Sequence, residues 1–557
     1  MACAIRLKAF AVEGVMVRKS REAQARLFGL FASSLRLIKP LRWQDAGDDA
    51  YELDVPEERT DPSKMLVLFV EGYRGSALVR LNGSPYYALD GYHAYVPLPA
   101  GGLRIRAEFS PLAAFGEVVG VSPGRPILLG LSRDVYLLYL YLDAVLELAR
   151  QAQDPELRQD LLALASSCLD RAYFKGFSPQ QVQVSMSFMR EALGVSLGQM
   201  VGLNEVGDVG TEETAKELHD LAQGAGFRED EDLSRYSEAL GELRKGLTAL
   251  RQKYGKRTEV YAVGNAHIDT AWLWPMSETR KKVLRTFSVA ATLAEQDEMT
   301  FLQSAALYHS WIKQDSPELF QRISELVKRG RWVLAAGWVE PDTNMVSGES
   351  LARQMLYSQR FYEQELGRRA EVMWLPDSFG FSGNLPQVAV LGGCRLFATH
   401  KVFWNDTNPF PHAAFAWVGI DGTSIPSLAF GHGRTGYAGT FQLADFVEQW
   451  KNAAGAGGPL LYAFGHGDGG GGPTPEMLVR KEVIDELPAL PSIQMGLPDV
   501  GSVPKEPRKW RGEIYLETHR GVYTSHSLMK LLNARAQEAL TEAELWSALA
   551  GSKQSFE

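Results

Sequence analysis

The spacing of apolar residues divides the chain into four stretches of different character. From residue 1 to about 125, short apolar runs alternate with polar turns, and Met65–Val70 and Ala77–Leu81 have the length and composition of strands. Asn82-Gly83 follows, and this dipeptide favours a tight hairpin because both residues tolerate a positive φ. We expect a β-rich, β-sandwich-like domain over 1–125. Its tyrosines, for which we favour a core or interdomain role over contact with carbohydrate, are Tyr86, Tyr87, Tyr92 and Tyr95.

The second stretch, from 126 to 255, has helical periodicity. Apolar residues recur at intervals of three and four, and breaks rich in Gly, Pro or Asp separate the periodic segments. We expect a helical connector that carries no chemistry. Its predicted helices are Val135–Ala149, Glu156–Ala172, Pro179–Leu197, Thr211–Ala222 and Asp230–Tyr254.

The third stretch, from 256 to 510, alternates between strand and helix patterns, which is typical of a parallel sheet or barrel with crossover helices. The predicted strands are Glu259–Val263, Met299–Gln303, Trp332–Ala336, Glu371–Leu375, Leu396–Thr399 and Leu460–Phe464. The predicted helices are Ser277–Ala294, Pro317–Lys328, Gly348–Leu366 and Pro475–Leu487. We expect a (β/α) barrel-like domain, whose reactive groups should collect at the carboxyl ends of the strands.

The last stretch, from 511 to 557, predicts a short strand, Ile514–Leu516, and then helices. One helix should run from Ser525 to about Leu540, and a second should begin near Thr541, where Thr541 and Glu544 have the spacing of a capping box. These helices expose an apolar face with little chain after it. We expect the start of a helical bundle that is incomplete.

Composition narrows the class of protein. A chain of 557 residues is too long for one core, so three or more domains are expected. The content of 45% hydrophobic and 22% charged residues is that of an ordinary globular protein. A net charge of −9 argues against a nucleic-acid binder that relies on phosphate neutralisation.

Cysteine usage and hydropathy point to the cytoplasm. Cys3, Cys168 and Cys394 are widely spaced and odd in number, so they make neither a disulfide framework nor a thiolate metal site. The first residues lack the pattern of a secretory signal, and we find no run of about 18 apolar residues. We therefore expect no membrane span.

Candidate chemistry begins after the first predicted strand of the third stretch. His267 and Asp269 are two residues apart, so on an extended backbone both side chains project to one face, as a metal site or an acid/base pair requires. Trp272 follows with a flat surface on which a sugar ring could lie. Asp377, after the strand ending at Leu375, is either a turn aspartate or a catalytic carboxylate.

Further polar groups follow later strands, namely Lys401, His466 and Asp468. Polar side chains that follow several strands would meet at the edge formed by the carboxyl ends of those strands. This pattern favours an active site over coincidence. Asp468 lies in a glycine-rich run that lacks the Gly-Lys-Ser/Thr ending of a phosphate-binding loop. We expect small residues there to let a substrate approach, with Asp468 at the mouth.

Four motifs together resemble glycoside hydrolase family 38 α-mannosidases, and most closely the cytosolic, cobalt- or zinc-responsive branch. They are residues 267–275 (HIDTAWLWP), 374–380 (WLPDSFG), 404–412 (WNDTNPFPH) and 467–473 (GDGGGGP). The resemblance covers about 256–545. It implies a retaining exo-α-mannosidase that acts on α-mannoside oligosaccharides with one divalent metal, usually zinc, with cobalt as the alternative.

The resemblance also implies residue roles. His267, Asp269 and Asp377 become metal ligands, which suits the preference of zinc for imidazole and carboxylate, and Asp377 is also the nucleophile. A retaining glycosidase pairs its nucleophile with a second carboxylate. Asp468 is the candidate acid/base. Contacts with the sugar are implied for Trp272, Phe379, Lys401 and Asp406, and Asp406 is also the reserve acid/base.

The end of the chain departs from the family. Glu544-Leu545-Trp546 matches a helical segment that the family soon follows with Gln-Phe-His-Asp, whose histidine is the fourth metal ligand, but here no such segment follows. We do not expect His466 or His432 to replace it. Our hypothesis is that the chain resembles the first half of an α-mannosidase and that a second polypeptide supplies the rest.

Two alternatives stay open from the residues alone. A His/Asp metal site at strand ends also suits a metal-dependent carbohydrate deacetylase or amidase, because a bound metal activates water. A catalytically silent carbohydrate-binding or truncated protein is the alternative outside enzymes.

Overall fold

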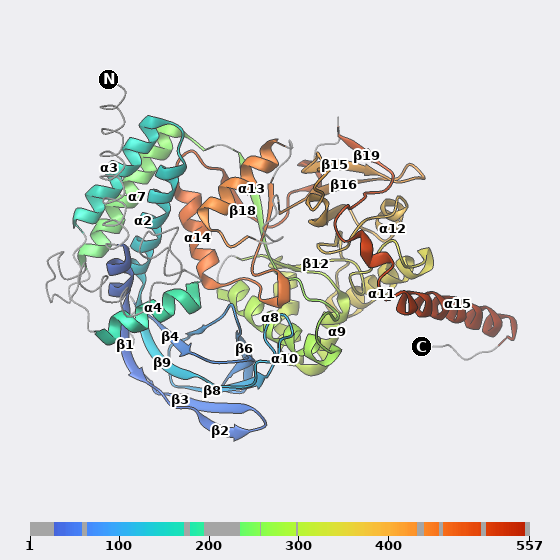
Figure 1. Ribbon diagram of the computed structural model, residues 1–557, viewed down its shortest axis with the longest axis horizontal. Helices are drawn as coiled ribbons and strands as arrows, with labels where there is room; N and C mark the ends of the chain where they lie inside the picture. Colours follow the sequence, from blue (N-terminus) through green and yellow to red (C-terminus); the bar gives the residue numbers. More distant parts are fainter. Residues whose placement is uncertain are drawn as a thin grey trace, which may run out of the picture.

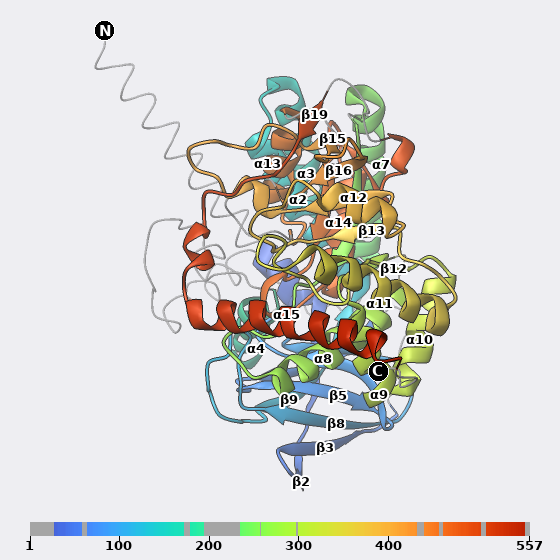
Figure 2. The same ribbon diagram turned by 90° about the vertical axis from the view of Figure 1, so that its right-hand side faces the viewer.

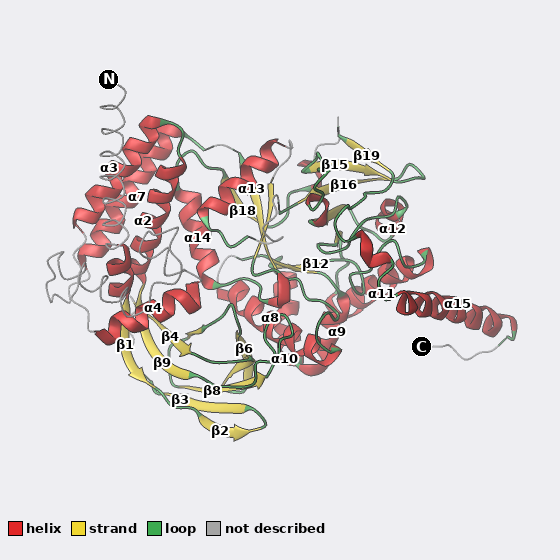
Figure 3. Ribbon diagram, viewed as in Figure 1, coloured by secondary structure: helices red, strands yellow, loops and turns green. Residues whose placement is uncertain are grey.

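The computed structural model describes residues 27–57, 64–171, 179–193, 234–256, 258–296, 299–431, 439–455, 460–502 and 508–551. Its first strands are β1 (Leu35–Pro40), β2 (Gln44–Gly47), β3 (Ala50–Val55), β4 (Lys64–Glu71), β5 (Ser76–Leu81), β6 (Ser84–Leu89), β7 (Tyr95–Leu98), β8 (Leu103–Ser110) and β9 (Arg125–Ser132). They form two antiparallel sheets, with the orders β2-β3-β8-β5-β6 and β1-β9-β4-β7 (Figures 1 and 3). Asn82 and Gly83 link β5 to β6 with φ of 51° and 94°, which confirms the predicted hairpin.

Helices follow the sheets, as predicted. They are α2 (Arg133–Gln151), α3 (Pro155–Arg171), α4 (Pro179–Leu193) and α7 (Ser234–Tyr254). α2, α3 and α7 lie side by side in Figure 1, and α2 buries Val135, Leu138, Leu142 and Val145, which share one face at three- and four-residue spacing. The predicted helix Thr211–Ala222 lies outside the described residues. Among the helices of the described part, none has the length and apolar character to cross a membrane.

The third stretch contains two mostly parallel sheets. Their strands are β10 (Glu259–Asn265), β11 (Phe301–Gln303), β12 (Trp332–Leu334), β13 (Val372–Trp374), β14 (Leu396–Thr399), β15 (Ala414–Val418), β16 (Ser424–Ala429), β17 (Leu460–Phe464), β18 (Ser492–Met495) and β19 (Lys509–Arg511). The orders are β12-β11-β10-β17, where β18 also pairs with β10, and β13-β14-β16-β15-β19. A parallel bridge between Ala335 and Val372 links the two sheets. All six strands predicted for this stretch are therefore present, some of them shorter than expected.

Helices separate these strands. They are α8 (Met276–Gln296), α9 (Ala306–Asp315), α10 (Pro317–Lys328), α11 (Gly348–Leu366), α12 (Leu385–Leu391), α13 (Leu443–Gly455) and α14 (Pro475–Glu486). The predicted bounds of α10 and α11 are confirmed to the residue. Each has a clear start signal, because Pro317 occupies the first turn of α10 and the Ser347 side chain accepts a hydrogen bond from the Ser350 N–H at the start of α11.

An apolar cluster lies between the two sheets. Side chains from β10, β11, β13, β14, β16 and β17 contribute to it, with Trp374 stacked on Phe430 at a ring distance of 4.3 Å. A larger core joins the same strands to the helices and to the first two sheets. The strands are thus buried on both faces, as is usual for parallel sheets.

Two predictions for the last stretch are wrong. Ile514 forms only an isolated bridge to Phe381, and the strand lies earlier, at β19. A single helix, α15 (Ser527–Leu549), replaces the two that were expected. Thr541 does not cap a new helix, because its hydroxyl donates to the carbonyl of Gln537 one turn earlier and no Gly or Pro interrupts the helix. Figures 1 and 2 show α15 projecting from the body beside α11.

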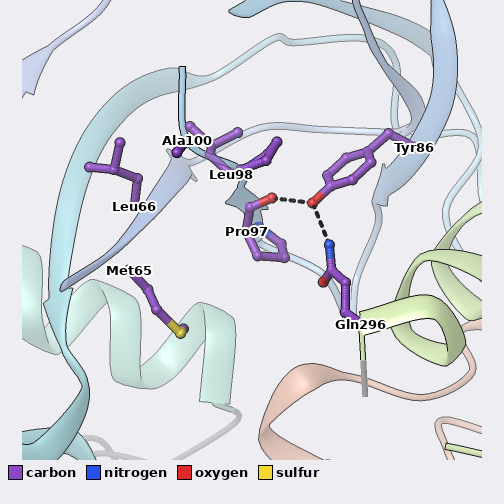
Figure 4. A pocket seen from close by; sticks show the side chains of 8 residues that line it. Met65, Leu66, Tyr86, Pro97, Leu98, Ala100 and Gln296 are labelled. Atoms are coloured by element: carbon purple, nitrogen blue, oxygen red, sulfur yellow. Dashed lines mark hydrogen bonds between the residues drawn. The ribbon is translucent and has the colours of Figure 1, made fainter. Parts of the chain in front are cut away.

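The tyrosines of the first stretch pack where its sheets meet the third stretch. The Tyr86 hydroxyl donates to the Pro97 carbonyl at 2.8 Å, and Gln296 of α8 donates to that hydroxyl at 3.4 Å, beside a cavity of about 250 Å³ (Figure 4). Tyr95 donates to the buried Glu476 of α14, and Tyr92 stacks on His466. The favoured interpretation, a core and interdomain role, is confirmed.

Candidate metal-dependent active site

Two strand ends bring one imidazole and two carboxylates together. His267 and Asp269 lie in the loop directly after β10, and Asp377 follows β13 in the same way. Nε2 of His267 lies 3.5 Å from Oδ1 of Asp269 and 3.5 Å from Oδ2 of Asp377. One ligand atom from each residue lies within 4.8 Å of the other two. The predicted trio therefore converges into a group that could hold a metal ion.

Glu340, which the sequence did not single out, approaches the other side of the His267 ring. Its Oε2 lies 3.5 Å from Nδ1 of His267, and the Ser304 hydroxyl donates a hydrogen bond to its Oε1. Glu340 follows β12 as His267 follows β10. Glu340 lies six residues beyond the end of β12, at the edge of the sheet where the other site residues lie. This position after a strand could have identified it from the sequence.

The carboxylates around His267 control its protonation. Burial by itself lowers the pKa of His267, but Glu340, Asp269 and Asp377 overcome this effect and raise the pKa well above its usual value. In the metal-free protein these carboxylates therefore favour the protonated form of the imidazole. A metal ion would displace the proton from the coordinating nitrogen, because a ligand imidazole binds through a lone pair.

Lys401 lies against the other oxygen of Asp377. Its Nζ is 2.7 Å from Asp377 Oδ1, and it lies 3.5 Å from the centre of the Trp404 ring and 5.4 Å from that of Phe379. Lys401 begins the 3₁₀ turn η1 (Lys401–Phe403) directly beyond β14. The two predicted contact residues Lys401 and Phe379 therefore meet at the candidate nucleophile.

His519 is a second residue beside the site that the sequence did not assign. Its ring lies 4.7 Å from that of Phe379 and 5.2 Å from that of Trp404. Burial lowers the pKa of His519, and the positive charge of Lys401 lowers it further, while Asp377 acts in the opposite direction. The ring is thus favoured in its neutral form. Its contact with Phe379 depends on a segment more than a hundred residues later, so no local pattern reveals it.

Asp406 lies in an exposed loop that Glu517 anchors. The Glu517 carboxylate accepts hydrogen bonds from the backbone N–H groups of Asp406, Thr407 and Asn408 at 2.9, 2.7 and 2.8 Å. These bonds, with that from Thr407 the strongest, lower the pKa of Glu517 to about 2. The side chain of Asp406 accepts from the Thr407 hydroxyl at 3.2 Å. No contact between Asp406 and the metal-ligand trio is found in the described part of the chain.

Asp468 begins the short 3₁₀ turn η2 (Asp468–Gly470), and its side chain lies outside what the structure describes. The backbone just before it is fixed to the trio, because the His267 N–H donates to the Gly467 carbonyl at 2.7 Å. His432 is also outside the described residues. His466 stacks on Tyr92 with a ring distance of 4.3 Å and is not part of the trio.

The glycine run after Asp468 is packed rather than open, contrary to our expectation of a substrate approach. A Cβ on Gly471 would lie 2.4 Å from the Tyr92 ring, and one on Gly470 would lie 3.0 Å from Ile268. Residues 469–472 are buried. Their small size therefore serves close packing against the loop after β10.

Trp272, three residues after Asp269 in the chain, is 57% exposed. Its ring makes an edge contact with Phe115, from the first domain, and another with Trp274. An exposed aromatic face beside a metal site is compatible with the predicted sugar contact.

The chain is similar to known α-mannosidases. Residues 257–500 match the family described as the glycosyl hydrolases family 38 N-terminal domain, which includes the whole trio and Glu340. The chain is 38% identical over 305 residues to an alpha-mannosidase of Saccharomyces cerevisiae and 39% identical over 299 residues to alpha-mannosidase 2C1 of Homo sapiens. Each match covers 52% of this chain but only 28% and 29% of those proteins. The predicted resemblance is confirmed.

A solved structure, that of an alpha-mannosidase from Enterococcus faecalis V583, aligns with 46% of this chain and 31% of its own at 18% identity and a TM-score of 0.41. The segments of this chain that match the yeast and human alpha-mannosidases span less than a third of the length of those two proteins.

Proposed function

Because the chain carries a family 38 N-terminal domain over residues 257–500, we propose that it is a metal-dependent retaining exo-α-mannosidase acting on terminal α-mannosides of oligosaccharides. The observation that carries this proposal is the convergence of His267, Asp269 and Asp377 within 4.8 Å. The resemblance to the cytosolic-type branch is our basis for proposing a cytoplasmic location.

We propose that the two sheets of the third stretch form a (β/α) barrel. The support is the parallel pairing, the bridge between Ala335 and Val372 and the apolar cluster that the strands share. His267, Glu340, Asp377 and Lys401 all follow carboxyl ends of these strands, which is where barrel enzymes bind their substrates.

The donor set fits zinc. One imidazole nitrogen and two carboxylate oxygens are ligands that a catalytic zinc ion accepts, and three protein ligands leave room for a substrate. Bound there, zinc would act as a Lewis acid that holds sugar hydroxyls. The trio itself would position the ion, and Glu340 would hold the His267 ring in place.

Asp377 is suited to be the nucleophile. Lys401 pairs with its Oδ1 at 2.7 Å and so holds the side chain in a fixed orientation. Attack by a carboxylate oxygen on the anomeric carbon forms a glycosyl ester and breaks the bond to the leaving group, and water then hydrolyses the ester. A second carboxyl group, in its protonated form, must donate a proton to the departing oxygen, and the carboxylate left behind then accepts a proton from the attacking water. We propose Asp468 for that role, with Asp406 as the reserve.

We also propose that a second polypeptide completes the protein. The support is the surface of α15, which exposes Leu528, Leu532, Leu540, Leu545 and Trp546. Several large apolar side chains exposed on one helix are typical of a surface that another chain covers. Purification of this chain alone in a folded and fully active form would contradict this part of the proposal.

The test of the function is an assay with 4-nitrophenyl α-mannoside, run with and without a chelator. We expect turnover that the chelator abolishes and added zinc restores. Asp377→Asn should lose at least about a thousandfold in kcat, because the amide cannot attack. Asp421→Asn, in an exposed turn of the same region, should have no effect.

Two results would reject the function. Acetyl release from an N-acetylated sugar without mannoside hydrolysis would point to the deacetylase. Mannoside binding that Asp377→Asn leaves intact, without turnover by the wild-type chain or by the chain with its partner, would point to a silent binding protein.

A further inference from the structure

A loop of the first domain, residues 113–117, reaches the candidate site. The ring of Phe115 lies edge-on to that of Trp272, with centroids 6.3 Å apart and planes at 88°. Both rings are partly exposed to solvent. Phe115 lies far outside the matched segment 257–500, so the family match says nothing of it.

The loop is held tightly against the segment that carries Trp272. A Cβ on Gly116 would lie 2.5 Å from the Leu273 carbonyl oxygen, and Gly116 has a φ of 90°. Only glycine allows both the approach and that backbone conformation without strain. Within the loop, the Ala113 N–H donates to the Glu117 carbonyl at 3.0 Å. The position of Phe115 beside Trp272 is therefore set by the backbone on both sides.

A buried lysine ties the same loop to the turn of the candidate acid/base. Nζ of Lys282 donates to the Ala114 carbonyl at 2.8 Å and to the Gly469 carbonyl at 3.4 Å. It also lies 4.5 Å from the centre of the Trp274 ring, and Lys282 is 2% exposed. The loop 113–117, the turn 468–470 and the segment 267–274 are thus joined at one buried cation.

This arrangement defines where a leaving group would lie. Trp272 is three residues beyond the metal-ligand candidate Asp269, and Gly469 follows the acid/base candidate Asp468 directly. The leaving-group oxygen must be next to the acid that protonates it. Because the turn 468–470 packs on residue 114, a group bound next to this turn would lie beside the loop 113–117.

We infer that Phe115, whose ring packs on that of Trp272, forms a subsite for the leaving group where the first domain meets the catalytic domain. The subsite takes a flat, partly apolar group, either a second pyranose or an aromatic aglycone. The inference rests on the proposed α-mannosidase function. It adds a specificity-determining residue from outside the family 38 domain.

The experiment measures binding by calorimetry to the zinc-loaded full chain. The two probes are methyl α-mannoside, which has almost no leaving group, and 4-nitrophenyl 1-thio-α-mannoside, which has an aromatic one and resists hydrolysis. Phe115→Ala should weaken the aryl thiomannoside by about three- to tenfold and leave methyl α-mannoside within about twofold of wild type. Phe115→Tyr should bind both as wild type does.

The controls separate this subsite from general damage. Val118→Ala changes an 80% exposed side chain just beyond the loop and should alter neither affinity. Phe115→Leu keeps most of the apolar volume, and it replaces Phe115→Ala as the test variant if Phe115→Ala does not fold. It should weaken the aryl probe selectively, because it lacks the flat ring.

The outcomes distinguish the two proposals. If the wild-type chain binds both probes and the Phe115 variants weaken neither, or both equally, the subsite is wrong and the α-mannosidase proposal stands. If the wild-type chain binds neither probe, both alone and with its partner polypeptide, the proposed function fails and the subsite fails with it.

Discussion

Nδ1 of His267 lies 3.5 Å from Oε2 of Glu340, while Nε2 of the same ring faces Asp269 and Asp377. The two ring nitrogens therefore have separate partners. A proton kept on Nδ1 by Glu340 makes Nε2 the nitrogen that would bind a metal, and Ser304 holds Glu340 in place through its other oxygen.

Replacing Glu340 should weaken metal binding. Glu340→Gln removes the negative charge that orients the His267 ring, and outer carboxylates of this kind typically contribute about ten- to a hundredfold in affinity. Zinc affinity is measured by competition with a chromophoric chelator. The matched control is Glu363→Gln, an exposed carboxylate on α11, which should bind zinc as wild type does. Unchanged affinity in Glu340→Gln would show that the ring needs no such support.

Replacing Lys401 should make the metal-free protein less stable and more responsive to zinc. Lys401→Met leaves Asp377 without its nearest cation, and breaking a buried pair costs about 3 kcal/mol. Zinc would restore part of this loss, since it supplies positive charge to the same carboxylate. Urea unfolding with and without zinc measures both effects. In Lys313→Met, which breaks an exposed pair with Glu365, the loss should stay under about 1 kcal/mol.

His309 should make stability fall in mild acid. Burial lowers its pKa to about 4, and the Trp332 indole N–H donates to its Nε2 at 3.0 Å, so the ring is neutral in the folded protein. The unfolded chain takes up the proton near pH 6.5, and the folded protein does so only near pH 4. Stability is therefore fully present above about pH 6.5, and up to about 3 kcal/mol is lost as the pH falls to 4.

The measurement for His309 is the free energy of unfolding between pH 4 and 7. His309→Gln should reduce this pH dependence without abolishing it, because burial also lowers the pKa of His466 to about 4, whereas His526→Gln, at an exposed position before α15, should preserve it. An equally steep dependence in His309→Gln would contradict the assignment.

A methyl group in the glycine run should destabilise the protein. Gly471→Ala would place its Cβ 2.4 Å from the Tyr92 ring and 2.8 Å from the His466 Cβ, and overpacking of this kind costs about 1–3 kcal/mol. Gly241→Ala, in α7 with no atom within 4 Å of the added Cβ, should instead stabilise by about 0.5–1 kcal/mol. Thermal unfolding compares the two. Unchanged thermal stability of Gly471→Ala would contradict this prediction and would show that Tyr92 and His466 move aside at little cost.

The sequence determined the elements whose signals are local. Helical periodicity with clear start signals predicted Pro317–Lys328 and Gly348–Leu366 to the residue, and Asn82-Gly83 predicted its hairpin. The spacing of His267 and Asp269 placed both on one face, and the strand-end pattern added Asp377. These features depend on neighbours a few residues apart, so the chain alone contains the information.

Only the tertiary structure decided the rest. Thr541 and Glu544 have capping-box spacing, but continuous helix hydrogen bonding and an ion pair between Glu544 and Arg353 overrode it. Short apolar runs gave no sign of the hairpin of β15 and β16. The contacts of Glu340 with His267 and of Phe115 with Trp272 join residues far apart in the chain, and such pairs become neighbours only when sheets and domains pack.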